Sequence, residues 1–221
     1  GTASLGSRSA VAQETQPKKP ERKPIFKSLK FGMIKGEMSI LDKFKLVQDL
    51  GYDGVELDSP GGQDKKQCLE ASRQTGLPIH GVVDSRHWSV RATEADPKRR
   101  SECLGDLLTA IKESHYCGGS SALFVPGHGK DGPEDEIVPR SLDVIQQALP
   151  TAAKLGIHIL IENVWNHMFY DHDGQPEQSA ERYAAFIDAC DSPWVGAYYD
   201  IGNHHKYGQP QDWVRTLGKR I

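Results

Sequence analysis

The 221-residue sequence predicts an α/β fold of the (β/α)8 barrel type. Short apolar runs rich in β-branched residues alternate with amphipathic stretches that are long enough for helices. This alternation is typical of a parallel sheet with crossover helices. About six such units follow one another, which is more than a flavodoxin-like sheet needs. A doubly wound open sheet is the alternative to the barrel.

The expected elements follow from this alternation. Ser39 is expected to cap the first helix, and Pro97 to begin the third, because proline tolerates the first turn. Pro139 and Pro150 are expected to bend or split the fourth helix. Residues 219–221 are expected to lead into a seventh strand. The strands are expected at 31–35, 53–57, 78–83, 121–125, 157–162 and 195–200, and the helices at 40–50, 64–75, 97–116, 134–155, 179–189 and from 211.

The predicted barrel domain covers residues 30–221. A complete (β/α)8 barrel typically has about 250 residues. We therefore expect a TIM barrel that is incomplete at its C-terminal end, with about six units and the start of a seventh strand.

Residues 1–29 differ in composition from the rest. Ala-Val-Ala at 10–12 has the form of a signal-peptidase site, and 13–27 combine three prolines with Lys, Arg and Glu. Such a segment cannot bury enough apolar surface to fold. We expect a signal-peptide remnant followed by a disordered linker, and hence an exported or periplasmic protein. Without a signal it would be cytoplasmic.

The overall composition limits the partners. The net charge of −3 provides no general attraction to nucleic-acid phosphates. No apolar run approaches the roughly 20 residues of a membrane-spanning helix. The four cysteines are far apart in the sequence and are interpreted as small core residues. We therefore expect no nucleic-acid or membrane partner, whereas a homo-oligomer is compatible with the sequence.

Polar residues stand at the ends of the expected strands, where a barrel positions its catalytic groups. Glu162 closes an almost wholly apolar strand, and Asp200 closes the next. Neighbouring strands lie about 4.8 Å apart, so the two carboxylates can converge on one divalent cation that neutralises their repulsion. Glu56 and His80 are expected near the ends of the second and third strands.

The same residues carry a resemblance to a known family. Ile-Glu-Asn at 161–163, Tyr-Asp-Ile-Gly-Asn-His at 199–204 and Gly-Tyr-Asp-Gly-Val-Glu-Leu at 51–57 resemble motifs of the sugar phosphate isomerase/epimerase family. This family belongs to the xylose isomerase-like TIM barrel superfamily and includes ketose 3-epimerases and hexulose-6-phosphate isomerase-like proteins. The resemblance extends from about Lys30 to the end of the sequence, and it is specific for the superfamily rather than for a substrate.

The resemblance implies a metal-dependent isomerase or epimerase that acts on a ketose or a ketose phosphate. One divalent ion, Mn, Mg, Co or Zn, would be bound by Glu162, Asp200 and a His and a Glu that the sequence does not contain. Two glutamates, one of them Glu162, would remove and return the proton beside the carbonyl while the metal stabilises the enediolate. With half of these ligands, the chain alone is expected to be inactive. The candidates for binding the sugar are Glu56, His80, His87, Asn163, Trp165, Asn203 and His204.

Two other functions are compatible with the sequence. An endonuclease IV-like metallohydrolase would share the barrel but hold several zinc ions, and the acidic balance argues against it. An exported, non-catalytic carbohydrate-binding barrel would bind a sugar without proton exchange. Export would favour a free sugar, because phosphorylated sugars are scarce outside the cytoplasm.

Overall fold

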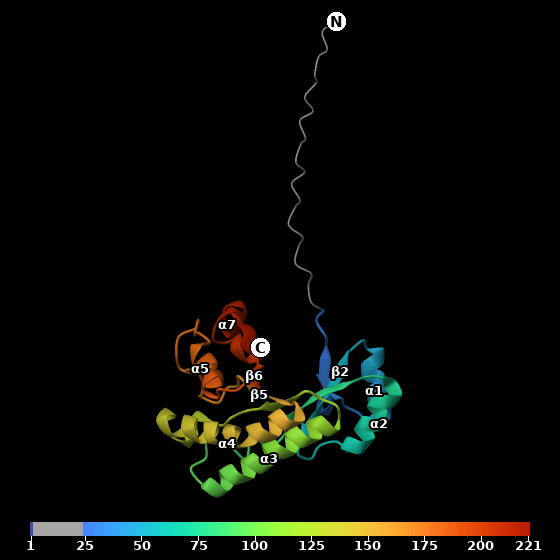
Figure 1. The fold of residues 1–221 in the computed structure, drawn as a ribbon, viewed down its shortest axis with the longest axis horizontal. Coiled ribbons are helices and arrows are strands. Elements are labelled where there is room, and N and C mark those ends of the chain that lie inside the picture. Colours follow the sequence, from blue (N-terminus) through green and yellow to red (C-terminus); the bar gives the residue numbers. More distant parts are fainter. Residues whose placement is uncertain (2–23) are drawn as a thin grey trace.

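The computed structural model describes Gly1 and residues 24–221, so the signal-peptidase motif and most of the expected linker lie outside the described residues. Within that part, six parallel strands form one sheet in chain order, and helices alternate with them as expected (Figure 1). β1 and β6 stand at its two edges. The strands are β1 (Ser28–Lys30), β2 (Gly54–Ser59), β3 (Ile79–Asp84), β4 (Ser121–Phe124), β5 (His158–Glu162) and β6 (Val195–Tyr198).

The helices cover the sheet in neighbouring pairs. α3 and α4 lie side by side, α1 packs on α2, and α5 packs on α7 (Figure 1). No helix in residues 24–221 is long and apolar enough to cross a membrane. The helices are α1 (Ile40–Asp49), α2 (Lys65–Thr75), α3 (Pro97–Tyr116), α4 (Glu134–Leu155), α5 (Glu181–Ala189), α6 (Ile201–His204) and α7 (Pro210–Leu217).

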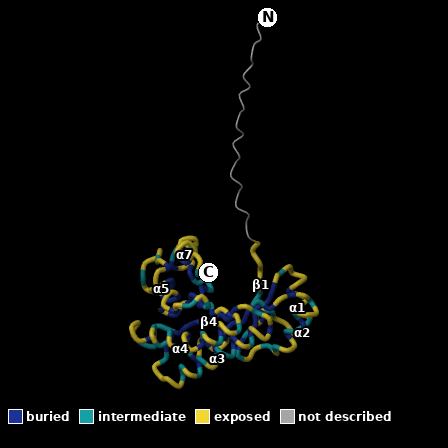
Figure 2. The backbone as a smooth tube through the Cα atoms, viewed as in Figure 1, coloured by how far each residue is buried: buried dark blue, intermediate teal, exposed yellow. Residues whose placement is uncertain are grey.

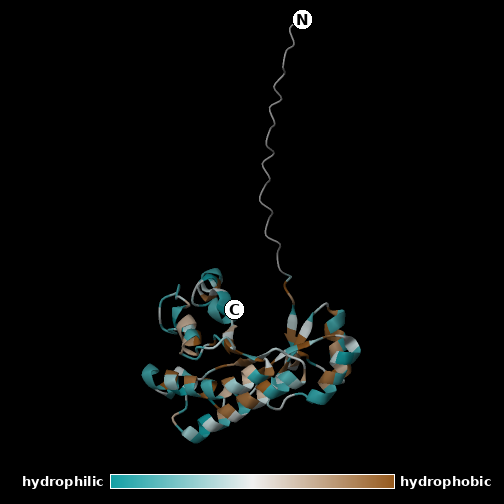
Figure 3. Ribbon diagram, viewed as in Figure 1, coloured by the Kyte–Doolittle hydropathy of each residue, from teal (hydrophilic) through white to brown (hydrophobic). Residues whose placement is uncertain are grey.

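The core lies between the sheet and the inner helix faces. The strands are mostly buried, whereas the outer helix surfaces are exposed (Figure 2). Hydrophobic residues follow the same division, with polar residues on the outer turns of the helices (Figure 3). All four cysteines are buried and free, as their interpretation as core residues requires.

Local signals explain where the helices begin and end. The Ser39 hydroxyl accepts a hydrogen bond from the Asp42 N–H at 3.1 Å and caps α1. Pro97 begins α3. Gly156 ends α4 in the left-handed conformation that glycine adopts without strain (φ 69°). The expected split of α4 is wrong, because the helix runs unbroken through Pro139 and Pro150.

Two expected strands differ from the structure. The first strand is Ser28–Lys30 rather than 31–35, because the chain turns into a 3-10 helix at Phe31, whose ring packs 5.5 Å from that of Phe44 in the core. At the other end, the expected lead-in to a seventh strand is a 3-10 helix, Gly218–Arg220, beside β6.

Candidate active site

The ends of β5 and β6 bring the two predicted carboxylates together. Glu162 is the last residue of β5 and pairs with Tyr198 of β6. The expectation that Asp200 closes the sixth strand is wrong, because β6 ends at Tyr198 and Asp200, two residues later, caps α6. Burial, followed by the nearby charges of Asp200 and Glu56, raises the pKa of Glu162 to about 7. The predicted convergence of Glu162 and Asp200 therefore agrees with their positions, and Glu56 reaches the same interior.

Asn163 fixes the backbone at Asp200. Its side-chain oxygen accepts the Asp200 N–H at 2.7 Å, and its side-chain nitrogen donates to the Asp200 carbonyl at 2.9 Å. Asn203 completes this arrangement, because its N–H donates to the Asp200 carboxylate at 2.7 Å and its side chain donates to the Asn163 carbonyl at 3.1 Å. Both asparagines thus act on the position of Asp200.

A second group of polar side chains lies on the first two strands. Lys30 of β1 is in register with Glu56 of β2, and Glu56 is only 5% exposed. Burial raises the pKa of Glu56 to about 7, while the Tyr198 hydroxyl and the Lys30 charge lower it in part. Lys30 also acts on Glu162, so its charge lies near both carboxylates.

The two histidines near β3 differ in position. His87 is buried, and burial followed by the charge of Lys30 lowers its pKa to about 3, so the ring is neutral. The expectation that His80 ends β3 is wrong, because β3 continues to Asp84. Side chains alternate along a strand, so His80 shares a face with Val82, which packs in the core against the helices. This position offers no support for sugar binding by His80.

Trp165 lies in the loop after β5, and His204 is the last residue of α6, which follows β6. The Trp165 ring is 49% exposed, and its indole N–H donates to the Asn203 carbonyl at 2.7 Å. The Lys206 ammonium lies over the ring, 5.2 Å from its centroid. The remaining exposed part of the side chain is compatible with the predicted sugar contact. His204 is fully buried, and its ring lies 3.8 Å from that of Trp213 and stacks on Tyr170. This packing favours a structural role for His204.

The carboxylate pair fits part of a metal site. Glu162 and Asp200 supply the hard oxygen ligands that divalent cations prefer, and a cation would relieve the repulsion between them. Among the described residues, no group of three or more His, Cys, Asp or Glu side chains is arranged to hold a metal. Glu162 and Asp200 would account for two of the ligands that the family resemblance implies.

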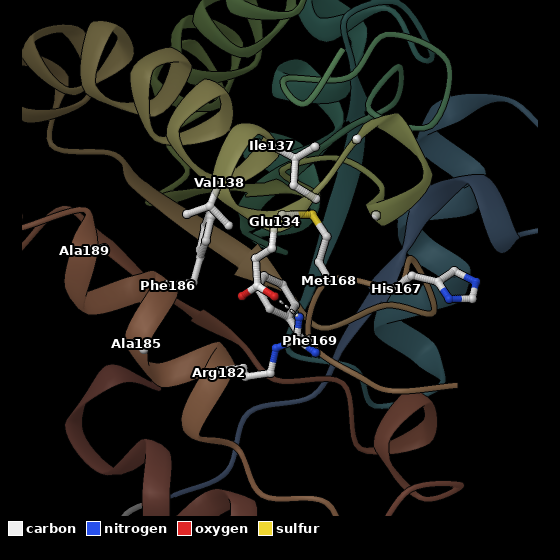
Figure 4. Close-up of a pocket in the computed structure, with 12 residues that line it drawn as sticks. Glu134, Ile137, Val138, His167, Met168, Phe169, Arg182, Ala185, Phe186 and Ala189 are labelled. Atoms are coloured by element: carbon white, nitrogen blue, oxygen red, sulfur yellow. Dashed lines mark hydrogen bonds and ion pairs between the residues drawn. The ribbon is translucent and has the colours of Figure 1, made fainter. Parts of the chain in front are cut away.

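A separate cavity of about 280 Å³ lies between α4 and α5. Ile137, Met168 and Phe186 are among the apolar side chains that line it (Figure 4). Arg182 pairs with Glu134 at 2.7 Å, and both side chains are largely exposed. None of the carboxylates of the candidate site lines this cavity, which we regard as a packing gap between helices.

Sequence reasoning missed Lys30 and Tyr198 as members of the site. Lys30 stands at the predicted domain boundary and outside the predicted first strand, so no local pattern marks it. Tyr198 does carry a signal, because it precedes Asp200 by two residues and alternation predicts that both face the same side.

Comparisons with known proteins agree with this architecture. A 3-keto-D-glucoside 4-epimerase from E. coli in its apo form is 16% identical, with a TM-score of 0.73 over 89% of this chain and 77% of that one. A D-allulose 3-epimerase from Methylomonas sp. is 19% identical (TM-score 0.70, 89% and 70%), and an L-ribulose 3-epimerase is 17% identical (TM-score 0.72, 89% and 67%). At these identities the likeness is one of fold.

The curated proteins contain no significant match. The family described as xylose isomerase-like TIM barrel matches residues 44–221, which is most of the sequence. The chain therefore belongs to the xylose isomerase-like TIM barrel family.

Proposed function

We propose that this protein is a metal-dependent sugar isomerase or epimerase that moves a proton at the carbon beside a ketose carbonyl. The observation that carries the proposal is the pair of partly buried carboxylates, Glu162 and Asp200, at the ends of neighbouring strands. The fold likeness to ketose epimerases is consistent with it. The substrate would be a ketose or a ketose phosphate.

Glu162 is the group that would exchange the proton. In the metal-free protein its pKa is raised to about 7 by burial and by the charge of Asp200, so the carboxyl group can both take up and release a proton near neutral pH. Asn163 and Asn203 would keep Asp200 beside it through the hydrogen bonds described above. The exposed part of the Trp165 side chain would contact the apolar side of the sugar.

Glu162 and Asp200 would hold the divalent metal ion, together with further ligands. When bound, the metal would supply polarisation of the substrate carbonyl and stabilise negative charge on its oxygen. The raised pKa of Glu162 would fall beside the cation, because a positive charge favours the ionised form.

The test is incorporation of solvent deuterium into ketoses and ketose phosphates by the full-length protein, with and without Mn²⁺. We expect exchange that requires the metal and falls at least about 100-fold in Glu162→Gln, as loss of a general acid/base implies. Glu37→Gln is the matched control, because Glu37 is exposed. Equal exchange by the wild-type protein and Glu162→Gln would contradict the assignment, and sugar binding without exchange would favour a non-catalytic barrel.

A further inference from the structure

Lys30 and Asp58 form an ion pair between the first two strands. The Lys30 ammonium lies 3.2 Å from Oδ1 of Asp58. Asp58 is two residues after Glu56 on β2, so both carboxylates project from the same face. The Lys30 charge acts on Glu56, Glu162 and His87. The ion pair therefore borders the interior that contains the candidate carboxylates.

Asp58 is held by its surroundings. The Gln63 side chain donates to Oδ2 of Asp58 at 2.9 Å and accepts the Asp58 N–H at 3.0 Å. Glycines leave the space that Asp58 fills, because a Cβ atom at Gly32 would lie 2.9 Å from Oδ2 and one at Gly62 would lie 2.7 Å from the Asp58 Cβ. The 3-10 helix after β1 and the loop after β2 thus leave room for the Asp58 side chain, which is 18% exposed beside a Lys30 side chain that is 40% exposed.

Glu56 supplies an unused acceptor next to this pair. The residue is only 5% exposed, and within residues 24–221 its Oε1 atom has no hydrogen-bond partner. A buried polar atom without a hydrogen-bond partner is unfavourable. A ligand that donates a hydrogen bond to this atom would therefore bind more tightly. The hydroxyl groups of a sugar are such donors.

We propose that Lys30 and Asp58, with Glu56 beside them, bind the hydroxyl groups of an uncharged sugar at the end remote from the reacting carbonyl. Lys30 donates hydrogen bonds, and the two carboxylates accept them. The inference rests on the proposed function for the assignment of Glu162 and Asp200 as the reacting end. To that function it adds the residues that bind the far end of the sugar and the expectation that the sugar is uncharged.

The charges of Lys30, Asp58 and Glu56 disfavour the binding of a phosphorylated sugar beside these residues. The ammonium of Lys30 faces the carboxylates of Asp58 and Glu56, so these three groups carry no net positive charge that would attract a phosphate dianion. His87 provides none, because its buried ring is neutral. A neutral sugar needs only the donors and acceptors that these side chains present.

The test measures binding and exchange separately. Binding of D-fructose, D-allulose and D-fructose 6-phosphate to the Mn²⁺-loaded, full-length protein is measured by calorimetry, and deuterium exchange is measured over a range of sugar concentrations. We expect Lys30→Met and Asp58→Asn to raise Kd and KM for a free ketose about 10-fold or more, as lost charge-assisted hydrogen bonds imply, with kcat changed less than about threefold. Lys35→Met and Asp49→Asn are matched controls at exposed positions and should leave both constants unchanged.

The outcomes separate this inference from the proposed function. Exchange in the wild-type protein with Kd and KM unaltered in both folded variants would overturn the inference and leave the function in place. Binding of a free ketose that weakens in both variants, without any exchange, would overturn the function and support the inference. Tighter binding of D-fructose 6-phosphate than of D-fructose, lost in Lys30→Met, would overturn the selection for an uncharged sugar.

Discussion

The side-chain amide of Asn163 binds both backbone polar groups of Asp200, with hydrogen bonds of 2.7 and 2.9 Å. Glu162 and Tyr198 form the last residue pair between β5 and β6. The Asn163 side chain therefore links the two segments directly after the end of the strand pairing. The backbone of Asp200, one predicted metal ligand, is thus hydrogen-bonded to Asn163, which directly follows Glu162, the other predicted ligand.

Replacing Asn163 by leucine should destabilise the protein by roughly 2–4 kcal/mol, because the part-buried backbone groups of Asp200 lose the partners that the buried Asn163 side chain supplies. It should also weaken Mn²⁺ binding about 10- to 100-fold, as changes to residues that orient metal ligands do. Urea unfolding and a Mn²⁺ titration measure the two effects. A stability loss with unaltered Mn²⁺ affinity in the folded variant would show that Asn163 does not position Asp200.

Replacing Asp200 by asparagine should lower the pKa of Glu162 from about 7 but leave it above 4.5. The charge of Asp200 is only the second cause of the shift, and burial, the larger one, is retained. A carboxyl ¹³C NMR titration of the metal-free protein measures this pKa. An unchanged pKa would mean that the two side chains do not face each other.

His87 should reduce stability in mildly acidic solution. Its pKa is lowered to about 3, below the 6.5 of a histidine in an unfolded chain, so its stabilising contribution is present above pH 6.5 and is lost as the pH falls toward 3. Between pH 7 and 5, the wild-type protein should lose about 2 kcal/mol more than His87→Gln does. Urea unfolding at both pH values tests this, with His205→Gln at an exposed position as the control. Parallel losses in all three proteins would contradict it.

Two glycines should respond oppositely to alanine. Gly105 lies within α3, and a Cβ atom at this position would have nothing within 4 Å, so Gly105→Ala should stabilise the protein by about 0.5–1 kcal/mol. At Gly81 a Cβ atom would lie 2.7 Å from the Ser121 carbonyl oxygen on β4, so Gly81→Ala should be destabilising. Thermal unfolding of both variants distinguishes the two effects, and a stabilising Gly81→Ala would show that β3 and β4 can separate freely.

The order of strands and helices could be predicted because each unit has a local pattern. The apolar run that ends at Glu162 and the capped helix after Ser39 are examples. The position of β1 could not be predicted in this way. Phe31 is as buried as a strand residue, but it enters the core from a 3-10 turn, so hydrophobicity alone assigns it to the wrong element.

The site was predictable only in part. Glu162 and Asp200 each end an apolar run, and their proximity follows from the order of neighbouring strands. The contribution of Lys30 depends on how the sheet curves, since its charge acts on Glu162 although their strands are not neighbours. His80 was misplaced because it is the second residue of β3, whereas the polar residue that ends this strand is Asp84.

The contact between Trp213 and His204 has a spectroscopic consequence. Trp213 is 1% exposed, whereas Trp88 and Trp165 are about half exposed, so its fluorescence should be shifted to shorter wavelength than theirs. Its ring lies 3.8 Å from that of His204, the last residue of the helix that begins after Asp200. The emission of Trp213 therefore provides an optical signal, internal to the protein, for the integrity of the segment that carries Asp200.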